Sequence, residues 1–341
     1  MSINIINKDS DSNIILSIAI PTHNGAKHIR EALDSIISQL NDINEKIEIL
    51  VSDNASSDGT GEIIREYIKK YSSIISYYKN DKNVGFDKNV DLLFKRAKGE
   101  YVWLLSDDDT LKRKSILNIF DKLNKYKCPS VLFLNYSECD KNMNERLYRY
   151  RLDIYEDVYC KDGDMFFQES KFLFGLISSL IIKRLEWNLI NIDKYINSGF
   201  VHVGAIIEIL KNQPSVIISD KLVNLRMDNP RGGLEGTFLY PGFNLVKLFQ
   251  GMKNLGYEKK TYEYLIGNMY SANLKAVLVA NSEGLKNKKD VIVNMIECYK
   301  KYPLFWLIHL PLLLLPNQIY KIMRLLYRVG KNGIKKLKGE L

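Results

Sequence analysis

Short apolar segments and amphipathic segments alternate along residues 14–134. Runs rich in apolar and β-branched residues predict strands at 14–20, 46–51, 74–78, 101–105 and 131–134. Apolar residues at helical spacing predict helices at 28–40, 58–71, 89–97 and 115–126. Strands that are joined by helical crossovers favour a mainly parallel, doubly wound sheet. We therefore expect an α/β fold in which helices flank such a sheet.

The alternation loosens after residue 135, where aromatic and charged residues become frequent. A further strand is predicted at 175–182 and a helix at 204–211. From about residue 240 the chain reads as helices that glycines separate. We expect a first domain at 1–239, with halves at about 14–135 and 136–239, followed by a helical region at 240–341.

Polar clusters follow three of the predicted strands. They are Pro-Thr-His-Asn at 21–24, the Ser- and Asp-rich stretch 52–60, and the Asp triplet 107–109. In a doubly wound sheet, ligands bind outside the carboxyl ends of the strands. We therefore expect the three clusters to converge on one crevice, which is the best candidate for an active site.

Three adjacent carboxylates, those of Asp107, Asp108 and Asp109, follow the apolar strand at 101–105. Because like charges repel, a fold that holds them together often has a cation beside them. Ligands that are all oxygen suit Mg²⁺ or Mn²⁺, which commonly bridge carboxylates to the phosphates of a substrate. The alternative is a solvated acidic turn that caps the next helix.

Asp53 ends the second strand, where its carboxylate can accept hydrogen bonds from a base N–H or from ribose hydroxyls. The alternative is that Asp53 only starts the turn into the next helix. No P-loop and no G-x-G-x-x-G sequence occurs in the strand–turn–helix context that it requires. ATPase and nicotinamide-dependent activities therefore lose their main support.

Composition restricts the compartment and the partners. The 341 residues are 46% hydrophobic and 26% charged, as in ordinary globular proteins, and the four cysteines show no C-x-x-C spacing. No signal-peptide pattern and no apolar run of about 20 residues is present, so we expect a cytoplasmic location.

The net charge of +9 suggests an anionic partner. Nucleic acid is disfavoured, because zinc spacings and reader motifs are missing and the basic residues near the end alternate with apolar ones. The apolar stretch 305–316 and the basic amphipathic segment 317–338 instead favour an anionic membrane surface at the inner face of the cell membrane. The alternative is a helical subdomain that packs on its own core or on a second subunit, as in a homo-oligomer.

Four segments, 16–24, 49–60, 83–86 and 99–109, together resemble the successive signatures of family 2 glycosyltransferases of the GT-A fold. The sequence Tyr-Val-Trp-Leu-Leu-Ser-Asp-Asp-Asp at 101–109 is similar to the corresponding segment of the subgroup that contains bacterial abequosyltransferases of O-antigen synthesis. The resemblance covers roughly residues 14–230. It implies a GT-A domain over 1–239, with a nucleotide-binding half followed by an acceptor half.

The resemblance implies roles for individual residues around a nucleotide-diphosphate sugar. Residues that would line the base, its ribose and the donor sugar are Pro21, Thr22, His23, Asp53, Asn83 and Gly85, with Phe86 beside them. Asp108 matches the metal-ligating Asp of the D-x-D motif, and Asp107 and Asp109 flank it, toward the nucleotide and the metal respectively. Ser106 replaces the first Asp of that motif. We therefore expect either that the Mn²⁺ or Mg²⁺ is held more weakly or that Asp109 supplies part of its site.

The implied reaction is an inverting displacement at the anomeric carbon, which requires a general base. The family's Glu-Asp pair is missing from 197–208, and His202 occupies the position where the base is expected. An imidazole with a pKa near ~6.5 is a workable base at neutral pH. The alternatives are a structural or acceptor-binding histidine, with Asp193 and Glu208 as weaker candidates for the base.

Family members often bring a basic residue from the region after residue 220 onto the diphosphate, and Arg226 or Arg231 matches it here. The alternative is a solvated strand end. The expected function is therefore the transfer of one sugar to a surface-polysaccharide precursor, such as a lipid-linked O-antigen or capsule glycan. A sugar nucleotidyltransferase is disfavoured, because 21–25 lacks the Gly-rich loop that it needs, and a catalytically idle scaffold subunit remains the alternative from another class.

Overall fold

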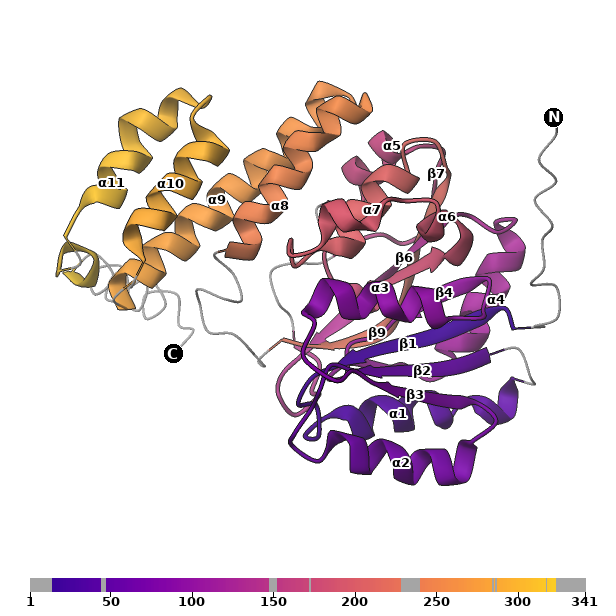
Figure 1. The fold of residues 1–341 in the computed structure, drawn as a ribbon. Helices are drawn as coiled ribbons and strands as arrows, with labels where there is room; N and C mark the ends of the chain where they lie inside the picture. Colours follow the sequence, from indigo (N-terminus) through magenta and orange to yellow (C-terminus); the bar gives the residue numbers. More distant parts are fainter. Residues whose placement is uncertain are drawn as a thin grey trace, which may run out of the picture. The chain divides into compact units, whose positions relative to one another are not determined.

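The computed structural model describes residues 14–43, 47–146, 152–171, 173–227, 240–283, 285, 287–316 and 318–322. The chain forms two compact units. The first unit contains residues 1–229 and 254–261, and the second contains residues 230–253 and 262–341. The sheet lies in the first unit, and the second unit is helical (Figure 1).

The first unit is built on one mixed sheet. Its strands are β1 (Leu16–Thr22), β2 (Ile47–Asp53), β3 (Ile75–Lys79), β4 (Tyr101–Leu104), β5 (Thr110–Leu111), β6 (Val131–Cys139), β7 (Val158–Cys160), β8 (Leu180–Lys183) and β9 (Ser215–Arg226). They follow the order β3-β2-β1-β4-β8-β6-β9-β5, and β7 pairs with β9. The expected α/β fold is confirmed. Pairing is parallel from β3 to β4, as predicted, whereas β5, β7 and β8 run antiparallel to their neighbours.

Helices cover both faces of the sheet. In Figure 1, α1 (Ile29–Ile37) and α2 (Thr60–Tyr71) lie on one side of β1–β3, and α3 (Phe86–Arg96) lies on the other. The remaining helices of this unit are α4 (Ser115–Lys125), α5 (Gly163–Glu169), α6 (Arg184–Asn188) and α7 (Val201–Ile209), with short 3₁₀ turns η1 (Leu40–Asp42), η2 (Ile177–Ser179) and η3 (Ile192–Tyr195). Of the strand predicted at 175–182, only residues 180–182 belong to β8, and residues 177–179 form the turn η2. The backbone carbonyl of Ser178 in this turn accepts a hydrogen bond from the Trp103 indole.

The core lies between the helices and the sheet. Strands β1, β2 and β4 are buried along their whole length, as expected for strands that are covered on both faces. Helix α1 turns Ile29, Leu33 and Ile36 inward, which matches the apolar spacing of the sequence. This rigid arrangement fixes the carboxyl ends of β1, β2 and β4 beside one another.

The second unit is a set of helices: α8 (Tyr240–Gly251), η5 (Met252–Leu255), α9 (Lys259–Glu283), α10 (Lys288–Tyr299), the π-helical η6 (Phe305–His309) and α11 (Leu310–Leu314). Residues 254–261, which include the end of η5 and the start of α9, belong to the first unit. Its buried residues include Phe243, Phe249, Met295 and Tyr299. Within the described ranges, no helix has both the length and the apolar character that crossing a bilayer requires.

Candidate active site

The polar clusters meet at the carboxyl edge of β1, β2 and β4. The Thr22 hydroxyl donates to Asp107 Oδ2 at 2.5 Å, which joins the end of β1 to the loop after β4. The Asn54 N–H donates to the Thr22 carbonyl at 2.8 Å, which joins the ends of β1 and β2. Pro21 lies within β1, opposite Ser52. The convergence that the sequence pattern predicts is therefore present.

Asp53 is fully buried at the end of β2. Its Oδ1 accepts the Ser56 N–H at 2.7 Å, and its Oδ2 accepts the Tyr77 hydroxyl at 2.6 Å. Burial and the neighbouring carboxylate together raise the pKa of Tyr77, so this tyrosine stays protonated and donates. Each carboxylate oxygen has a second lone pair with which to accept a bond from a ligand.

A second polar group links the loops after β1, β2 and β3. The His23 ring donates from Nδ1 to the Asn54 carbonyl at 2.8 Å, and the Asn54 amide donates to Asn83 Oδ1, also at 2.8 Å. The same Asn83 oxygen accepts the Gly85 N–H at 2.9 Å. Gly85 has a φ of +84°, a backbone conformation that other residues rarely adopt. His23, Asn83 and Gly85 are exposed, so these side chains and backbone groups border the site from the solvent side.

Residues 106–109, named here the aspartate loop, hold their three carboxylates in different surroundings. Asp107 and Asp109 are buried, and Asp108 is partly exposed. The Ser106 hydroxyl donates to Asp108 Oδ1 at 2.5 Å, so the residue that departs from the family motif orients the central carboxylate.

Asp109 is bound on both sides by its own chain. Its Oδ2 accepts the Ser178 hydroxyl at 2.5 Å, and its Oδ1 accepts the Arg226 N–H at 2.8 Å. Burial, followed by the charges of Asp108 and Asp107, raises the pKa of Asp109 to about 7 in spite of these hydrogen bonds. Both oxygens of Asp109 are thus engaged in holding the loop.

The aspartate loop offers oxygen ligands that a divalent metal could use. In the part of the chain that the structure describes, no group of three or more His, Cys, Asp or Glu is arranged to hold a metal ion. Mg²⁺ typically uses one or two carboxylates together with water and substrate phosphates, and does not need a complete protein cage. The partly exposed, hard-oxygen carboxylate of Asp108 fits such a site.

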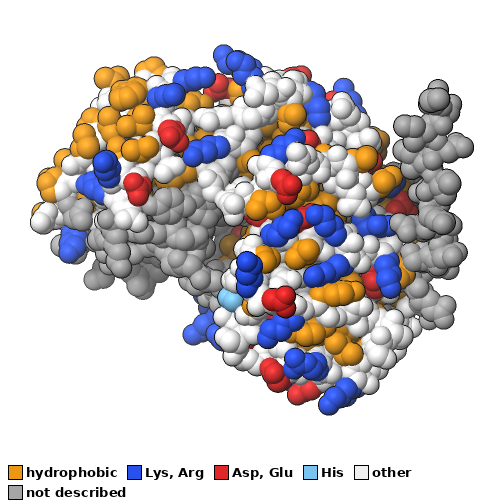
Figure 2. Space-filling model, in the orientation of Figure 1, with side chains coloured by type: hydrophobic (Ala, Val, Ile, Leu, Met, Phe, Trp, Pro, Cys, Tyr) orange, Lys and Arg blue, Asp and Glu red, His pale blue; other side chains and the backbone are white. Residues whose placement is uncertain are grey.

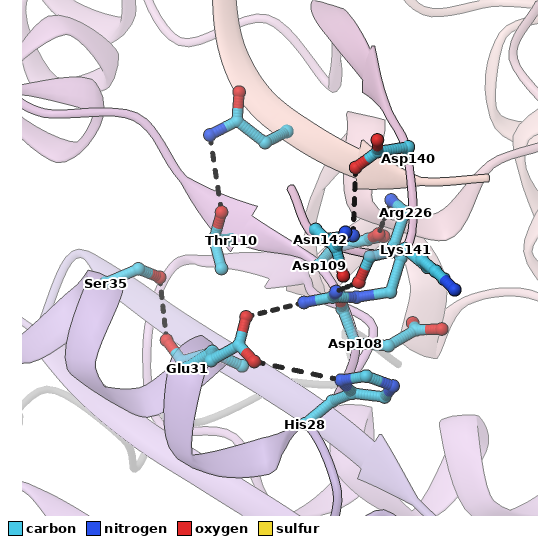
Figure 3. Close-up of polar contacts among 12 residues, drawn as sticks. His28, Glu31, Ser35, Asp108, Asp109, Thr110, Asp140, Lys141, Asn142 and Arg226 are labelled. Carbon is cyan, nitrogen blue, oxygen red and sulfur yellow. Dashed lines mark hydrogen bonds and ion pairs between the residues drawn. The ribbon is translucent and has the colours of Figure 1, made fainter. Parts of the chain in front are cut away.

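Arg226 lies beside the aspartate loop, as Figure 3 shows. Its Nε donates to the Asp108 carbonyl at 3.0 Å, its Nη1 to the Lys141 carbonyl, and its Nη2 to Glu31 Oε2 at 2.6 Å. Three of the five N–H groups of the guanidinium predicted to bind the diphosphate therefore donate to groups of its own chain. Arg231, the other candidate, lies outside the described residues.

His202 is buried in the first turn of α7 with 1% of its surface exposed. Its Nε2 lies 3.0 Å from the Gly175 carbonyl, and its ring contacts Phe86 and Phe200. Burial lowers the pKa of His202 to about 4, so the ring is neutral and donates to that carbonyl. This geometry favours the structural role recognised as the alternative and gives no support to the role of general base.

The weaker base candidates lie nearby. Glu208 accepts hydrogen bonds from Lys194 Nζ at 2.5 Å and from the Tyr195 hydroxyl, and Asp193 is exposed. Both donors bind the same oxygen, Glu208 Oε1, so Glu208 is held by its own chain.

Three residues of the site carry no local sequence signal. Tyr77, which holds Asp53, looks like an ordinary strand residue. Ser178, which holds Asp109, and Glu31, which pairs with Arg226, come from segments far from their partners in the chain. Only the register of β3 against β2, which places Tyr77 opposite Val51, could have suggested the first.

Comparison with known proteins gives the family. The model of "Glycosyl transferase family 2" matches residues 17–182. The abequosyltransferase RfbV of Salmonella typhimurium is 30% identical over 227 residues, which are 63% of this chain and 68% of that protein. The glycosyltransferase GlyG of Streptococcus pneumoniae is 25% identical over 185 residues, or 51% of this chain and 60% of its own.

Solved structures share the fold. S. aureus TarS 1-349 in complex with UDP matches with a TM-score of 0.60 at 14% identity, over 85% of this chain and 81% of that one. The mannosyltransferase PcManGT from Pyrobaculum calidifontis, in complex with GDP-Man and Mn²⁺, matches with a TM-score of 0.52 at 17% identity, over 87% and 84%. At such identities the likeness shows the GT-A fold alone. With the sequence matches, it follows that the chain belongs to glycosyl transferase family 2 and is a glycosyltransferase.

Proposed function

We propose that the protein transfers a sugar, with inversion, from a nucleoside diphosphate sugar to a hydroxyl of a bacterial surface-polysaccharide precursor. The observation that carries this proposal is the Thr22–Asp107 hydrogen bond, which joins the end of β1, where Thr22 lies opposite Asp53, to the aspartate loop. A nucleoside held near Asp53 would extend its diphosphate toward Asp108. The name of the Salmonella relative, an abequosyltransferase, supports the transfer of a sugar. An acceptor glycan of the O-antigen or capsule type is what the sequence resemblance implies.

Recognition of the nucleoside is assigned to the ends of β1, β2 and β3. Pro21, Thr22 and His23 would line the base, and Asp53 would accept hydrogen bonds from the base or the ribose through its remaining lone pairs. Asn83 and Gly85 would border the nucleotide and the donor sugar. The hydrogen bonds among these loops support the assignment, because they keep the binding groups in place before the ligand arrives.

Asp108 is proposed as the main protein ligand of Mn²⁺ or Mg²⁺, with Asp107 directed toward the nucleotide side. Asp109 would act mainly by holding the loop, since both of its oxygens are hydrogen-bonded to Ser178 and Arg226. When bound, the metal offsets the negative charge that develops on the departing diphosphate.

In the proposed reaction, the acceptor oxygen forms a bond to the anomeric carbon while the bond from that carbon to the diphosphate oxygen breaks. The electron pair leaves on the diphosphate, and the acceptor proton passes to a base. The sequence predicts His202 as this base, but its burial and its hydrogen bond to the Gly175 carbonyl favour a structural role, so we assign no residue to the base.

The second unit is proposed to bring the enzyme to the inner face of the membrane, beside a lipid-linked acceptor. Apolar side chains are exposed around η6 and α11, and Figure 2 shows hydrophobic side chains gathered with lysines over this part of the molecule. The exposed residues are Leu304, Trp306, Leu307, Ile308, Leu314, Ile319 and Ile322.

The charge of the chain supports this surface. Residues 300–341 contain nine of the 49 Lys and Arg but only one of the 40 Asp and Glu, so the rest of the chain carries a net charge of only +1. Exposed apolar side chains in a stretch of sequence with a surplus of cations match an anionic bilayer surface. Most of the basic segment predicted at 317–338 lies outside the described residues.

Thermal unfolding with UDP, CDP, GDP and dTDP, each with and without Mn²⁺, tests the donor site. A ligand at ~100 times its dissociation constant adds about 2.7 kcal/mol to the free energy of unfolding. We expect one nucleotide to stabilise the protein only when Mn²⁺ is present. Absence of a shift with every nucleotide would support the alternative of an idle subunit.

Sedimentation with vesicles tests the membrane surface. We expect binding to anionic vesicles that decreases with salt, little binding to neutral vesicles, and little binding to duplex DNA. Equal binding to DNA would contradict the membrane proposal. Trp306→Ser should weaken vesicle binding, whereas Tyr155→Ser, an exposed aromatic residue of the first unit, should not.

A further inference from the structure

Arg226 is the last residue of β9, at a point where three strands meet. Strand β5, which directly follows the aspartate loop, pairs antiparallel with β9 through Thr110 and Asn224. Strand β6 pairs with the other side of β9, with Cys139 opposite Arg226. The end of β9 is therefore placed by the sheet itself directly beside the aspartate loop.

Arg226 holds two successive aspartates by different groups. Its main-chain N–H donates to Asp109 Oδ1 at 2.8 Å, and its Nε donates to the Asp108 carbonyl at 3.0 Å. The far end of the guanidinium donates to the Lys141 carbonyl and to Glu31 Oε2, as Figure 3 shows. All three guanidinium nitrogens thus donate to groups of the chain.

The Glu31–Arg226 pair is asymmetric in its exposure. The Arg226 side chain is 2% exposed, whereas that of Glu31 on α1 is 51% exposed, and their N–O distance is 2.6 Å. Glu31 forms an ion pair with the buried guanidinium terminus. Burial, together with the charges of Arg226 and Lys27, lowers the pKa of His28, which also lies beside Glu31. Glu31 therefore anchors the outer end of Arg226, and Arg226 anchors the loop.

We propose that Arg226 is a positioning residue, which Glu31 holds in place and which in turn fixes Asp108 in the orientation that metal binding requires. On this view Arg226 does not bind the diphosphate. The inference rests on the proposed function, because it takes Asp108 as the metal ligand. A rigid guanidinium fork suits this role, since a lysine ammonium could not reach the same acceptors at once.

The two roles for Arg226 predict opposite results for Glu31→Gln. If Arg226 positions the loop, loss of the Glu31 charge loosens the loop and weakens Mn²⁺ binding. If Arg226 instead binds the diphosphate, loss of a competing carboxylate frees the guanidinium, and nucleotide binding stays equal or becomes tighter. Because Glu31 is half exposed, the glutamine variant should fold.

The experiment is a calorimetric titration of Mn²⁺ into the protein, in the presence of the nucleoside diphosphate that stabilises it. Partners that orient metal ligands typically contribute 10- to 100-fold to metal affinity, so we expect Glu31→Gln to weaken Mn²⁺ binding about 10-fold and Arg226→Lys still more. The matched control is Glu66→Gln, which removes a carboxylate from the exposed Arg30–Glu66 pair of 2.8 Å between α1 and α2.

We expect the control to bind Mn²⁺ like the wild type, and Glu31→Gln to unfold at a temperature close to that of the control. Wild-type affinity or tighter binding in Glu31→Gln would overturn the inference. Should Arg226→Lys fail to fold, Glu31→Gln alone decides. Absence of binding in the wild type would instead show that the proposed donor site itself is wrong, so the two failures are distinguishable.

Discussion

Gly25 lies against the Thr22–Asp107 hydrogen bond that connects β1 to the aspartate loop. Its replacement by alanine should strongly lower the stability of the protein. A Cβ at this position would lie 2.2 Å from Asp107 Oδ2 and 2.4 Å from Thr22 Oγ1. The backbone cannot easily retreat, because the Gly25 N–H donates to Thr60 Oγ1 at 2.9 Å and its carbonyl accepts the Ile29 N–H, also at 2.9 Å. The new methyl group must therefore displace the hydrogen-bonded pair.

The magnitude follows from two contributions. Overpacking of a buried site costs about 1–3 kcal/mol, and loss of a hydrogen bond to a charged group costs about 1.5–3 kcal/mol. Because one displacement causes both, we expect Gly25→Ala to lower the free energy of unfolding by about 3 kcal/mol. For a unit of this size, the midpoint temperature of thermal unfolding should fall by roughly 6–12 °C. Nucleotide binding should weaken as well, since the displaced Asp107 belongs to the site.

Urea unfolding that is followed by tryptophan fluorescence measures this loss, because Trp103 and Trp187 are buried in the first unit. The matched control is Gly175→Ala, whose Cβ would meet only Phe200 Cε1 at 3.9 Å. We expect the control to stay within about 0.5 kcal/mol of the wild type. If Gly25→Ala were equally stable, the close contact of Gly25, Thr22 and Asp107 would not exist as described.

Three further predictions test the site and its support. Tyr77→Phe removes the hydroxyl that donates to the buried Asp53 carboxylate, so it should cost about 1.5–3 kcal/mol in urea unfolding and weaken nucleotide binding; an unchanged affinity would separate Asp53 from the nucleotide. Burial alone would raise the pKa of Asp157, but hydrogen bonds, that of Lys122 foremost, lower it to about 2. Asp157 therefore contributes stability above pH ~4 that is lost as the pH falls toward 2, and Asp157→Asn should flatten stability against pH in this range, whereas an unchanged slope would refute the contribution. His202→Gln keeps a donor toward the Gly175 carbonyl and should retain turnover with an unaltered pH–rate profile; loss of the ascending limb would instead identify His202 as the base.

The parts of the fold that depend on local pattern could be predicted from the sequence. Alternating apolar and amphipathic segments predicted the order of strands and helices up to β6, except for the two-residue strand β5, and the parallel half of the sheet follows from that order. The meeting of 21–24, 52–60 and 107–109 at one edge could also be predicted, because parallel strands with helical crossovers bring their carboxyl ends together.

The contacts between distant segments could not be predicted in this way. Glu31 and Arg226 are 195 residues apart, and Asp109 and Ser178 are 69 apart, so no periodicity joins them. The sequence pattern marks Arg226 as a cation near the site, but only the folded structure shows that all three of its guanidinium nitrogens donate to groups of the chain. Likewise, the sequence places His202 at the position where the base is expected. Its burial among Phe86, Phe200 and Gly175 depends on tertiary packing, which the sequence pattern does not show.

The most direct test of the donor site is calorimetric titration of the stabilising nucleoside diphosphate into wild type, Asp108→Asn and the control Asp121→Asn, in Mn²⁺ and in EDTA. Asp121 is exposed on α4, so its replacement leaves the proposed site intact. We expect wild type and Asp121→Asn to bind in Mn²⁺ and to lose most of their affinity in EDTA, and Asp108→Asn to bind weakly in both. Equal, metal-independent binding by all three proteins would contradict the account of Asp108 as the metal ligand of a nucleotide-sugar site.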